Sequence, residues 1–165
     1  RMNPSHGGWL VLSSILVAMV LSVGHLPGGL PDWIAWLRPE WMVLVLFFWV
    51  VEVPERIGMI LAWLTGIVTD VLLGEPLGLN GLCFAAITYV GWSLYERIRM
   101  YSTPQQASLL FLLVLVIGAV KVTVNTWSDD VDWTFAFIIP ALTTTLAWFP
   151  VAFLLKRLSE KFDVS

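Results

Sequence analysis

Six apolar stretches, separated by short polar breaks, fill nearly all of this 165-residue chain. A membrane core about 30 Å thick requires around 20 apolar residues as a helix, with some tolerance for shorter spans. Backbone groups in hydrocarbon must be hydrogen-bonded internally, so apolar runs of this length are helical in lipid. The six predicted spans cover residues 8–26, 40–53, 57–73, 77–95, 108–127 and 133–155. The chain is therefore predicted to be an all-α membrane protein, a single integral membrane domain over residues 1–165.

The composition agrees with this prediction. Hydrophobic residues make up 58% of the chain and charged residues 13%, and the mean hydropathy is +0.83. Soluble domains carry about a quarter charged residues. The chain has ten tryptophans, a residue that gathers at membrane–water boundaries. Trp49, Trp63 and Trp148 fall inside predicted spans and are expected to pack against neighbouring helices.

The distribution of Lys and Arg predicts the orientation, because short cytoplasmic loops carry an excess of both. With six spans and a cytoplasmic N-terminus, two basic residues, Arg38 and Lys121, fall on the outer side. The seven on the cytoplasmic side are Arg1, Arg56, Arg97, Arg99, Lys156, Arg157 and Lys161. Both ends of the chain are thus predicted to face the cytoplasm.

The second predicted span, 40–53, is unusually short. Its 14 residues reach only about 21 Å as a helix. A helix this short either thins the bilayer or is shielded by its neighbours, and we expect shielding. Because a tight turn with Pro54 follows, this span is also expected to form an antiparallel hairpin with the third span, 57–73.

Motifs for catalysis are absent from the sequence. It has no Gly-rich phosphate loop, Gly-x-Ser-x-Gly elbow or zinc-protease motif. The single cysteine, Cys83, excludes an internal disulfide and a cysteine-based metal cage. We therefore expect a protein that is not an enzyme and that uses no cofactor, metal or nucleic acid.

The third span carries the sharpest local pattern. Gly66, Asp70, Gly74 and Gly78 follow one another at intervals of four residues, which places side chains on one helical face. Small residues at this spacing let helix backbones approach closely in lipid. The pattern predicts a helix-packing surface, either internal or toward a partner, although Gly78 could instead lie in the turn that follows. It leaves open a homodimer formed through the same face.

Asp70 needs a partner, because a charge in the hydrocarbon region costs several kcal/mol. Lys121 is also expected toward the outer side, in the fifth span. One hypothesis is that Asp70 and Lys121 pair directly or share a polar outer cavity. The alternative is that Lys121 extends to the interface and that Asp70 caps or is solvated near a helix end.

Several segments together resemble the bacterial rod shape-determining protein family MreD. They are Arg38-Pro39-Glu40-Trp41 at the start of the second span, Trp49 and Pro54 beyond it, and the segment from Gly66 to Gly78 that contains Asp70. The number of spans, the length and the basic C-terminal tail also agree, over essentially the whole chain. Arg38 and Trp41 are the next candidates for a partner interface, beside their simpler interpretation as an interfacial anchor.

This resemblance implies a non-enzymatic scaffold subunit of the cell-elongation (Rod) complex in the bacterial inner membrane. The family is similar in fold to the substrate-binding S-components of energy-coupling-factor transporters. Its expected partner is MreC, through the membrane helix and membrane-proximal segment of MreC. RodA, a class B penicillin-binding protein and the MreB filament are expected as indirect partners, and membrane lipids surround the helices.

Two other classes of function stay open. One is a transporter subunit that resembles an S-component and captures a small molecule or lipid in an outward-facing pocket. The other is a membrane-embedded enzyme that uses Asp70 with Glu52 or Glu75. The expected position of Glu52 near the opposite membrane face from Asp70 disfavours joint chemistry by those two.

Overall fold

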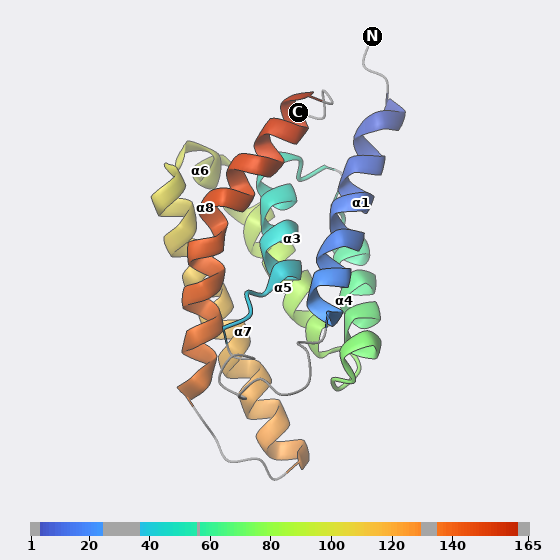
Figure 1. Ribbon diagram of the computed structural model, residues 1–165, viewed down its shortest axis with the longest axis vertical. Coiled ribbons are helices and arrows are strands. Elements are labelled where there is room, and N and C mark those ends of the chain that lie inside the picture. Colours follow the sequence, from blue (N-terminus) through green and yellow to red (C-terminus); the bar gives the residue numbers. More distant parts are fainter. Residues whose placement is uncertain (1–3, 25–36, 56, 130–134, 162–165) are drawn as a thin grey trace.

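The computed structural model describes residues 4–24, 37–55, 57–129 and 135–161, and every regular element within these ranges is a helix (Figure 1). In chain order the elements are α1 (Pro4–Val23), α3 (Trp41–Glu52), α4 (Met59–Leu73), α5 (Leu79–Ser93), α6 (Tyr95–Met100), α7 (Thr103–Asp129), the 3₁₀ turn η1 (Phe135–Phe137) and α8 (Ile138–Lys161). The all-α prediction is confirmed for the described residues.

Most boundaries lie within four residues of the predicted ones. The exceptions are α7, which begins five residues before the predicted start at 108, and α8, which begins five residues after 133 and ends six residues after 155. The early start of α7 is stabilised by one of the two hydrogen bonds of a capping box. The side chain of Gln105 accepts a hydrogen bond from the backbone N–H of Ser102, at 2.9 Å, as the third helical residue of such a motif does. Pro104 also suits a first helical turn, where a missing N–H is tolerated.

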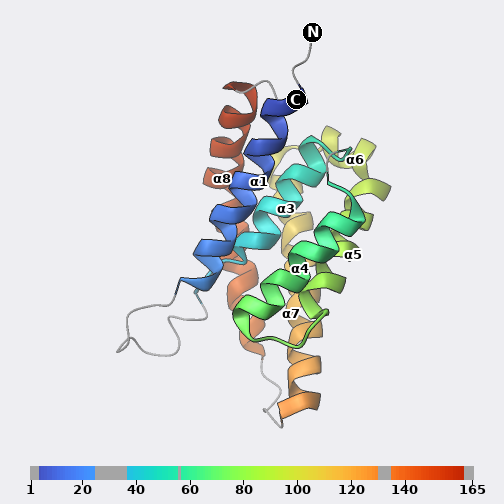
Figure 2. The same ribbon diagram turned by 90° about the vertical axis from the view of Figure 1, so that its right-hand side faces the viewer.

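The short helix α3 lies at the centre of the bundle. It packs against α1, α5 and α8, and Figures 1 and 2 show it enclosed between these helices. Every residue from Met42 to Val51 is buried. Shielding of this short helix by its neighbours is thereby confirmed. Because α3 does not face the surroundings, it can be apolar on all sides.

Two of the three mid-span tryptophans pack as predicted. Trp49 is fully buried and donates a hydrogen bond from Nε1 to Oγ of Ser14 at 2.7 Å. Trp148 is 1% exposed, and its ring meets that of Phe47 edge to face at 5.1 Å. Trp63 packs against a neighbouring helix only in part, because it is 42% exposed while its Cδ1 atom lies beside Gly81 of α5.

Helix α4 packs mainly against α5, so the predicted α3–α4 hairpin is wrong. The reason is the small face of α4. A Cβ atom added at Gly66 would lie 2.4 Å from the Cα atom of Gly81 on α5, closer than real Cβ contacts allow. Only glycine permits this approach, which brings the two backbones into direct contact.

The surface of the bundle is largely apolar. Two segments, Thr103–Trp127 and Phe135–Lys161, are long and apolar enough to cross a membrane, and only 28% and 22% of their most apolar stretches are buried. A core helix of a soluble protein would be mostly buried, whereas these helices expose Val116, Leu146 and Phe153. The helices Gly8–Val23, Trp41–Glu52 and Met59–Leu73 are apolar but shorter. A mostly apolar outer surface is consistent with a membrane environment.

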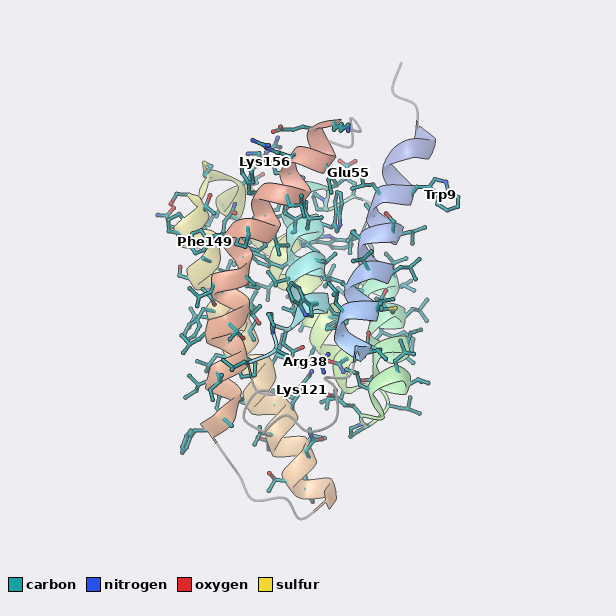
Figure 3. All side chains as sticks on the ribbon, viewed as in Figure 1. Trp9, Arg38, Glu55, Lys121, Phe149 and Lys156 are labelled. Atoms are coloured by element: carbon teal, nitrogen blue, oxygen red, sulfur yellow. The ribbon has the colours of Figure 1, made fainter. Side chains whose placement is uncertain are left out.

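The two ends of the bundle differ in which elements they contain. At one end, here called the α6 end, lie α6, the start of α1 and the end of α8 (Figure 1). At the other, here called the turn end, lies the turn between α4 and α5. Lys156 and Glu55 lie toward the α6 end, and Arg38 and Lys121 lie toward the turn end (Figure 3).

Candidate functional site

The turn between α4 and α5 begins and ends at a glycine with a positive φ angle. Gly74 (φ 69°) ends α4, and Gly78 (φ 93°) precedes α5. Side chains with a Cβ atom rarely adopt this left-handed conformation. Gly74 and Gly78 therefore form the turn, and of the predicted stripe only Gly66 and Asp70 lie on the buried face of α4.

Asp70 caps helix α5 from the end of α4. Its Oδ2 accepts a hydrogen bond from the backbone N–H of Gly78 at 2.8 Å. Its Oδ1 accepts from the backbone N–H and the side-chain Nδ2 of Asn80, at 2.9 and 2.8 Å. The first N–H groups of a helix have no partner within the helix and favour a negative charge. These three donors explain how the Asp70 side chain, which is 0% exposed, is accommodated in the bundle.

A chain of polar contacts leads from Asp70 to Lys121. Nδ2 of Asn80 also donates to Oε2 of Glu75, at 2.6 Å. The same Oε2 lies 3.7 Å from Nζ of Lys121, which lies 3.3 Å from Oε1 of Glu40. We call Asp70, Asn80, Glu75, Lys121 and Glu40 the polar network. It joins α4, α5, α7 and the residue before α3.

The predicted pairing of Asp70 with Lys121 takes a different form. Among the described residues, the ion pairs of Lys121 are with Glu40 and Glu75, and Asp70 is linked to it only through Asn80 and Glu75. The physical reason is that the donors at the start of α5 already occupy both carboxylate oxygens of Asp70. Lys121 instead neutralises carboxylates that do not cap a helix.

Glu40 also ties α3 to α8. Its backbone N–H donates to Oγ1 of Thr144 at 2.9 Å, and that hydroxyl donates to the carbonyl oxygen of Pro140 at 2.6 Å. A hydroxyl that accepts and donates at once satisfies two part-buried backbone groups. The first turn of the central helix is therefore held by α8 as well as by Lys121.

Arg38 holds the end of α1. Its Nη2 donates to the carbonyl oxygens of Leu21 and Ser22, at 3.1 and 3.3 Å, and to that of Gly24. The last carbonyl groups of a helix have no partner within the helix, and a cation there is favourable. Trp41 is half-buried and packs against the hydrophobic core.

A cavity of about 260 Å³ lies beside the polar network. Its lining comes from residues far apart in the sequence and includes Arg38, Glu40, Trp41, Glu75 and Lys121. The structure thus brings Arg38, Trp41 and Lys121 together at one cavity, while Gly66 and Asp70 lie inside the α4–α5 contact.

Sequence reasoning missed Glu40, Glu75 and Asn80 as partners of Lys121 and Asp70. One signal was available for the two glutamates. Glu40 begins the second predicted span and Glu75 follows the third, both on the outer side that was also expected for Lys121.

The arrangement offers little for catalysis. Glu52 ends α3 and lines a cavity at the α6 end, whereas Asp70 caps α5 at the turn end. Both oxygens of Asp70 are engaged by donors of the fold, so its carboxylate holds helices together. No cluster of His, Cys, Asp and Glu suited to a metal ion occurs in the part of the chain that the structure describes.

These features define a class: an all-helical protein with a largely apolar surface, consistent with a membrane, whose helices are joined toward one end by a partly buried polar network. The family model for the rod shape-determining protein MreD matches residues 4–158. The rod shape-determining protein MreD of Haemophilus influenzae is 30% identical over 147 residues, which cover 89% of this chain and 88% of that protein. No solved structure matches the chain. The chain belongs to the MreD family, a family of rod shape-determining proteins that is not known as an enzyme family.

Proposed function

We propose that this protein is a non-enzymatic scaffold subunit of the cell-elongation (Rod) complex. In this role it binds MreC and thereby helps regulate peptidoglycan synthesis and rod shape. RodA, a class B penicillin-binding protein and MreB are connected to it indirectly through the complex. The observation that carries the proposal is membership in the MreD family over nearly the whole chain. A fold of apolar helices with its internal carboxylates engaged in helix packing supports a scaffold.

The proposed topology is a multi-pass protein of the inner membrane with six spans and both termini in the cytoplasm. The clustering of basic residues supports it. Arg99 and Lys156 line one cavity at the α6 end, and Arg97 lies on the same short helix as Arg99. A reporter protein that is active only in the cytoplasm should be active when it is fused after Ser165. A periplasm-specific reporter at the same position should be inactive, and the reverse result would refute this topology.

The proposed MreC interface is at the turn end, near the mouth of the 260 Å³ cavity. Arg38 and Trp41 would contact the membrane-proximal segment of MreC there. Gly66 and Asp70 would act indirectly, because they hold α4 and α5 together and so position the turn between these helices. Gly74 and Gly78 shape the turn beside it.

Cysteine crosslinking to coexpressed MreC tests this interface. Leu73, which is 39% exposed and lines the cavity, is a better probe than Gly74, where a φ of 69° would strain a side chain. We expect Leu73→Cys and Trp41→Cys, in a Cys83→Ala background, to crosslink to cysteines in the membrane-proximal segment of MreC.

The matched control is Met100→Cys, which is 78% exposed at the α6 end. It should not crosslink to the same MreC positions. Equal crosslinking from Met100 would show that the proposed location is wrong. Failure of MreC to copurify with the unmodified protein would contradict MreC binding itself.

A second candidate is an S-component-like subunit that binds a small molecule or lipid. The cavity beside the polar network favours it, because both cationic and anionic groups line it. Mass spectrometry of the purified protein should then show a copurified small molecule that Lys121→Met removes. Recovery of MreC without such a molecule would favour the scaffold.

A further inference from the structure

A second, larger cavity lies at the α6 end, far from the polar network. Its volume is about 550 Å³, and its walls come from the end of α3, from α6, from the start of α7 and from α8. Glu52 and Glu55 line it from the α3 side, Arg99 from α6 and Lys156 from α8. Figure 3 shows Lys156 and Glu55 toward this end of the bundle.

Charges of both signs face this cavity without neutralising one another. Among the residues that the structure describes, both ion pairs within 4.0 Å involve Lys121, and none involves Glu52, Glu55, Arg99 or Lys156. Arg99 is held in place by Tyr95, whose hydroxyl accepts from Nη1 at 3.2 Å and whose ring lies 6.0 Å from the guanidinium carbon. Two cations and two anions therefore line a space wide enough to hold another group between them.

The floor of the cavity is apolar, with one exception. Phe48, Val51 and Trp148 contribute to the lining. Trp148 is 1% exposed, and its Nε1 has no hydrogen-bond partner among the described residues. A buried N–H without a partner is unfavourable, so this group calls for an acceptor from outside the described residues.

The surroundings match a membrane lipid. From Lys156 toward the middle of the bundle, α8 exposes Phe153 (59%), and Figure 3 shows Phe149 on the same helix, further from the α6 end. A headgroup in the cavity would therefore leave its acyl chains beside apolar helix surface. The guanidinium of Arg157 lies 4.4 Å from the ring centre of Phe153, with its stem along that surface.

We propose that this cavity binds the headgroup of a zwitterionic phospholipid that carries a phosphate and a primary ammonium. Arg99 and Lys156 bind the phosphate, because a guanidinium and an ammonium form charge-assisted hydrogen bonds with phosphate oxygens. Glu52 and Glu55 accept hydrogen bonds from the lipid ammonium. An anionic lipid would pair with the two cations but would meet the two carboxylates as like charges.

The test uses the full-length protein, delipidated in neutral detergent and titrated with single lipids. Phosphatidylethanolamine carries both groups, phosphatidylglycerol lacks the ammonium, and phosphatidylcholine has a quaternary ammonium without N–H donors. Lipid-bound and lipid-free protein are counted by native mass spectrometry. We expect phosphatidylethanolamine to bind about tenfold more tightly than either of the others, which corresponds to one charge-assisted contact.

Charge-neutral variants assign the two halves of the site. Glu52→Gln with Glu55→Gln should reduce the preference for phosphatidylethanolamine over phosphatidylglycerol to about unity. Lys156→Gln should weaken binding of both lipids about tenfold. The matched controls are Arg97→Gln and Glu96→Gln, which lie on α6 but do not line the cavity, and they should leave both affinities unchanged.

Three outcomes would overturn the proposal. Equal binding of the three lipids would show adsorption to the apolar surface without recognition. A preference for phosphatidylglycerol that persists in the glutamate variants would indicate simple attraction of an anionic lipid. Full binding by Lys156→Gln, with control-like thermal stability showing that the variant is folded, would exclude the cavity as the site. None of these results bears on MreC binding, which concerns the turn end.

Discussion

Both ends of the bundle contain charged residues, but those at the turn end are largely buried and paired, whereas those at the α6 end are mostly exposed and form no ion pair with described residues. At the turn end, Asp70 is 0% exposed and accepts three hydrogen bonds, and the side chain of Lys121 is 12% exposed between two carboxylates. At the α6 end, Arg99 and Lys156 are exposed on an open cavity and form no ion pair with described residues. Burial thus decides whether a charge holds helices together or stays available to another molecule. Substitutions at the turn end should cost stability, whereas those at the α6 end should change binding alone.

The largest effect is expected for Asp70→Asn. An asparagine can accept with one oxygen, but its own NH₂ group would face a donor at the start of α5. The substitution should lower the free energy of unfolding by about 3 kcal/mol, because hydrogen bonds to a charged acceptor are strong and buried donors would lose their partner. Thermal unfolding in detergent measures this effect. Glu96→Gln, an exposed carboxylate on α6, is the control and should behave like the unmodified protein.

Lys121→Met should follow, with a loss of about 2 kcal/mol, because it leaves Glu40 and Glu75 close together without their cation. Adding Glu40→Gln should restore part of this loss. A double-mutant cycle for Lys121 and Glu40 should give a coupling of about 1 kcal/mol, as residues in direct contact do. Strict additivity of the two substitutions would show that the 3.3 Å contact contributes no stability.

Exchanging the charges of Asp70 and Lys121 provides a further check on the same network. A direct ion pair would allow Asp70→Lys with Lys121→Asp to recover stability. We expect the exchange to be no better than either single substitution, because a lysine cannot accept the hydrogen bonds that Asp70 receives from Gly78 and Asn80.

Gly66→Ala should destabilise the protein by about 1–3 kcal/mol, the usual cost of overpacking. The added methyl group would meet the backbone of Gly81, which cannot move aside as a flexible side chain could. Gly58→Ala is the matched control. Apart from its own neighbours in the chain, no atom of the described residues lies within 4 Å of its added Cβ, and its φ of −74° suits any residue. The same loss from both variants would mean that the close α4–α5 approach is not what makes Gly66 necessary.

The helices were predictable from the sequence, and the contacts between them were less so. Long apolar runs predict helices in lipid. The shortness of α3 was the reason to expect that neighbouring helices would shield it, and its residues from Met42 to Val51 are buried. The α3–α4 hairpin was predicted because the two segments are adjacent in the sequence. The prediction was wrong because small residues, such as Gly66 and Gly81, let α4 pack closely against α5 instead. The start of α7 was predicted too late, because the capping box of Ser102 and Gln105 is polar and lies before the apolar run.

The candidate site was partly predictable for a similar reason. Asp70 was recognisable because a carboxylate within an apolar run needs a partner. Helix capping by Asp70 was one of the two interpretations of the sequence, and the structure shows it. The particular N–H groups at the start of α5 were not predictable, because every residue except proline supplies a backbone N–H. Side-chain partners from distant segments, such as Glu40 with Lys121, require knowledge of which helices are neighbours.

Arg38→Gln should cost about 1 kcal/mol, less than the buried changes, because the guanidinium is only half-buried at the end of α1. Its loss removes the contacts with the carbonyl oxygens of Leu21 and Ser22. Hydrogen exchange should show faster opening of the last turn of α1, with the centre of that helix unaffected. Arg97→Gln, on the exposed face of α6, should change neither quantity.

The smallest effect is expected at the α6 end. Glu55→Gln combined with Lys156→Gln should change the free energy of unfolding by no more than about 0.5 kcal/mol in lipid-free detergent, because both side chains are exposed and neither forms an ion pair with described residues. The same double variant should lose the extra thermal stability that phosphatidylethanolamine gives the unmodified protein, since a ligand stabilises only the state that binds it. A loss comparable to that of Lys121→Met without lipid would mean that these charges support the fold, and the contrast between the two ends would fail. A small loss without lipid, together with a large loss of lipid stabilisation, would separate the two ends as the geometry requires.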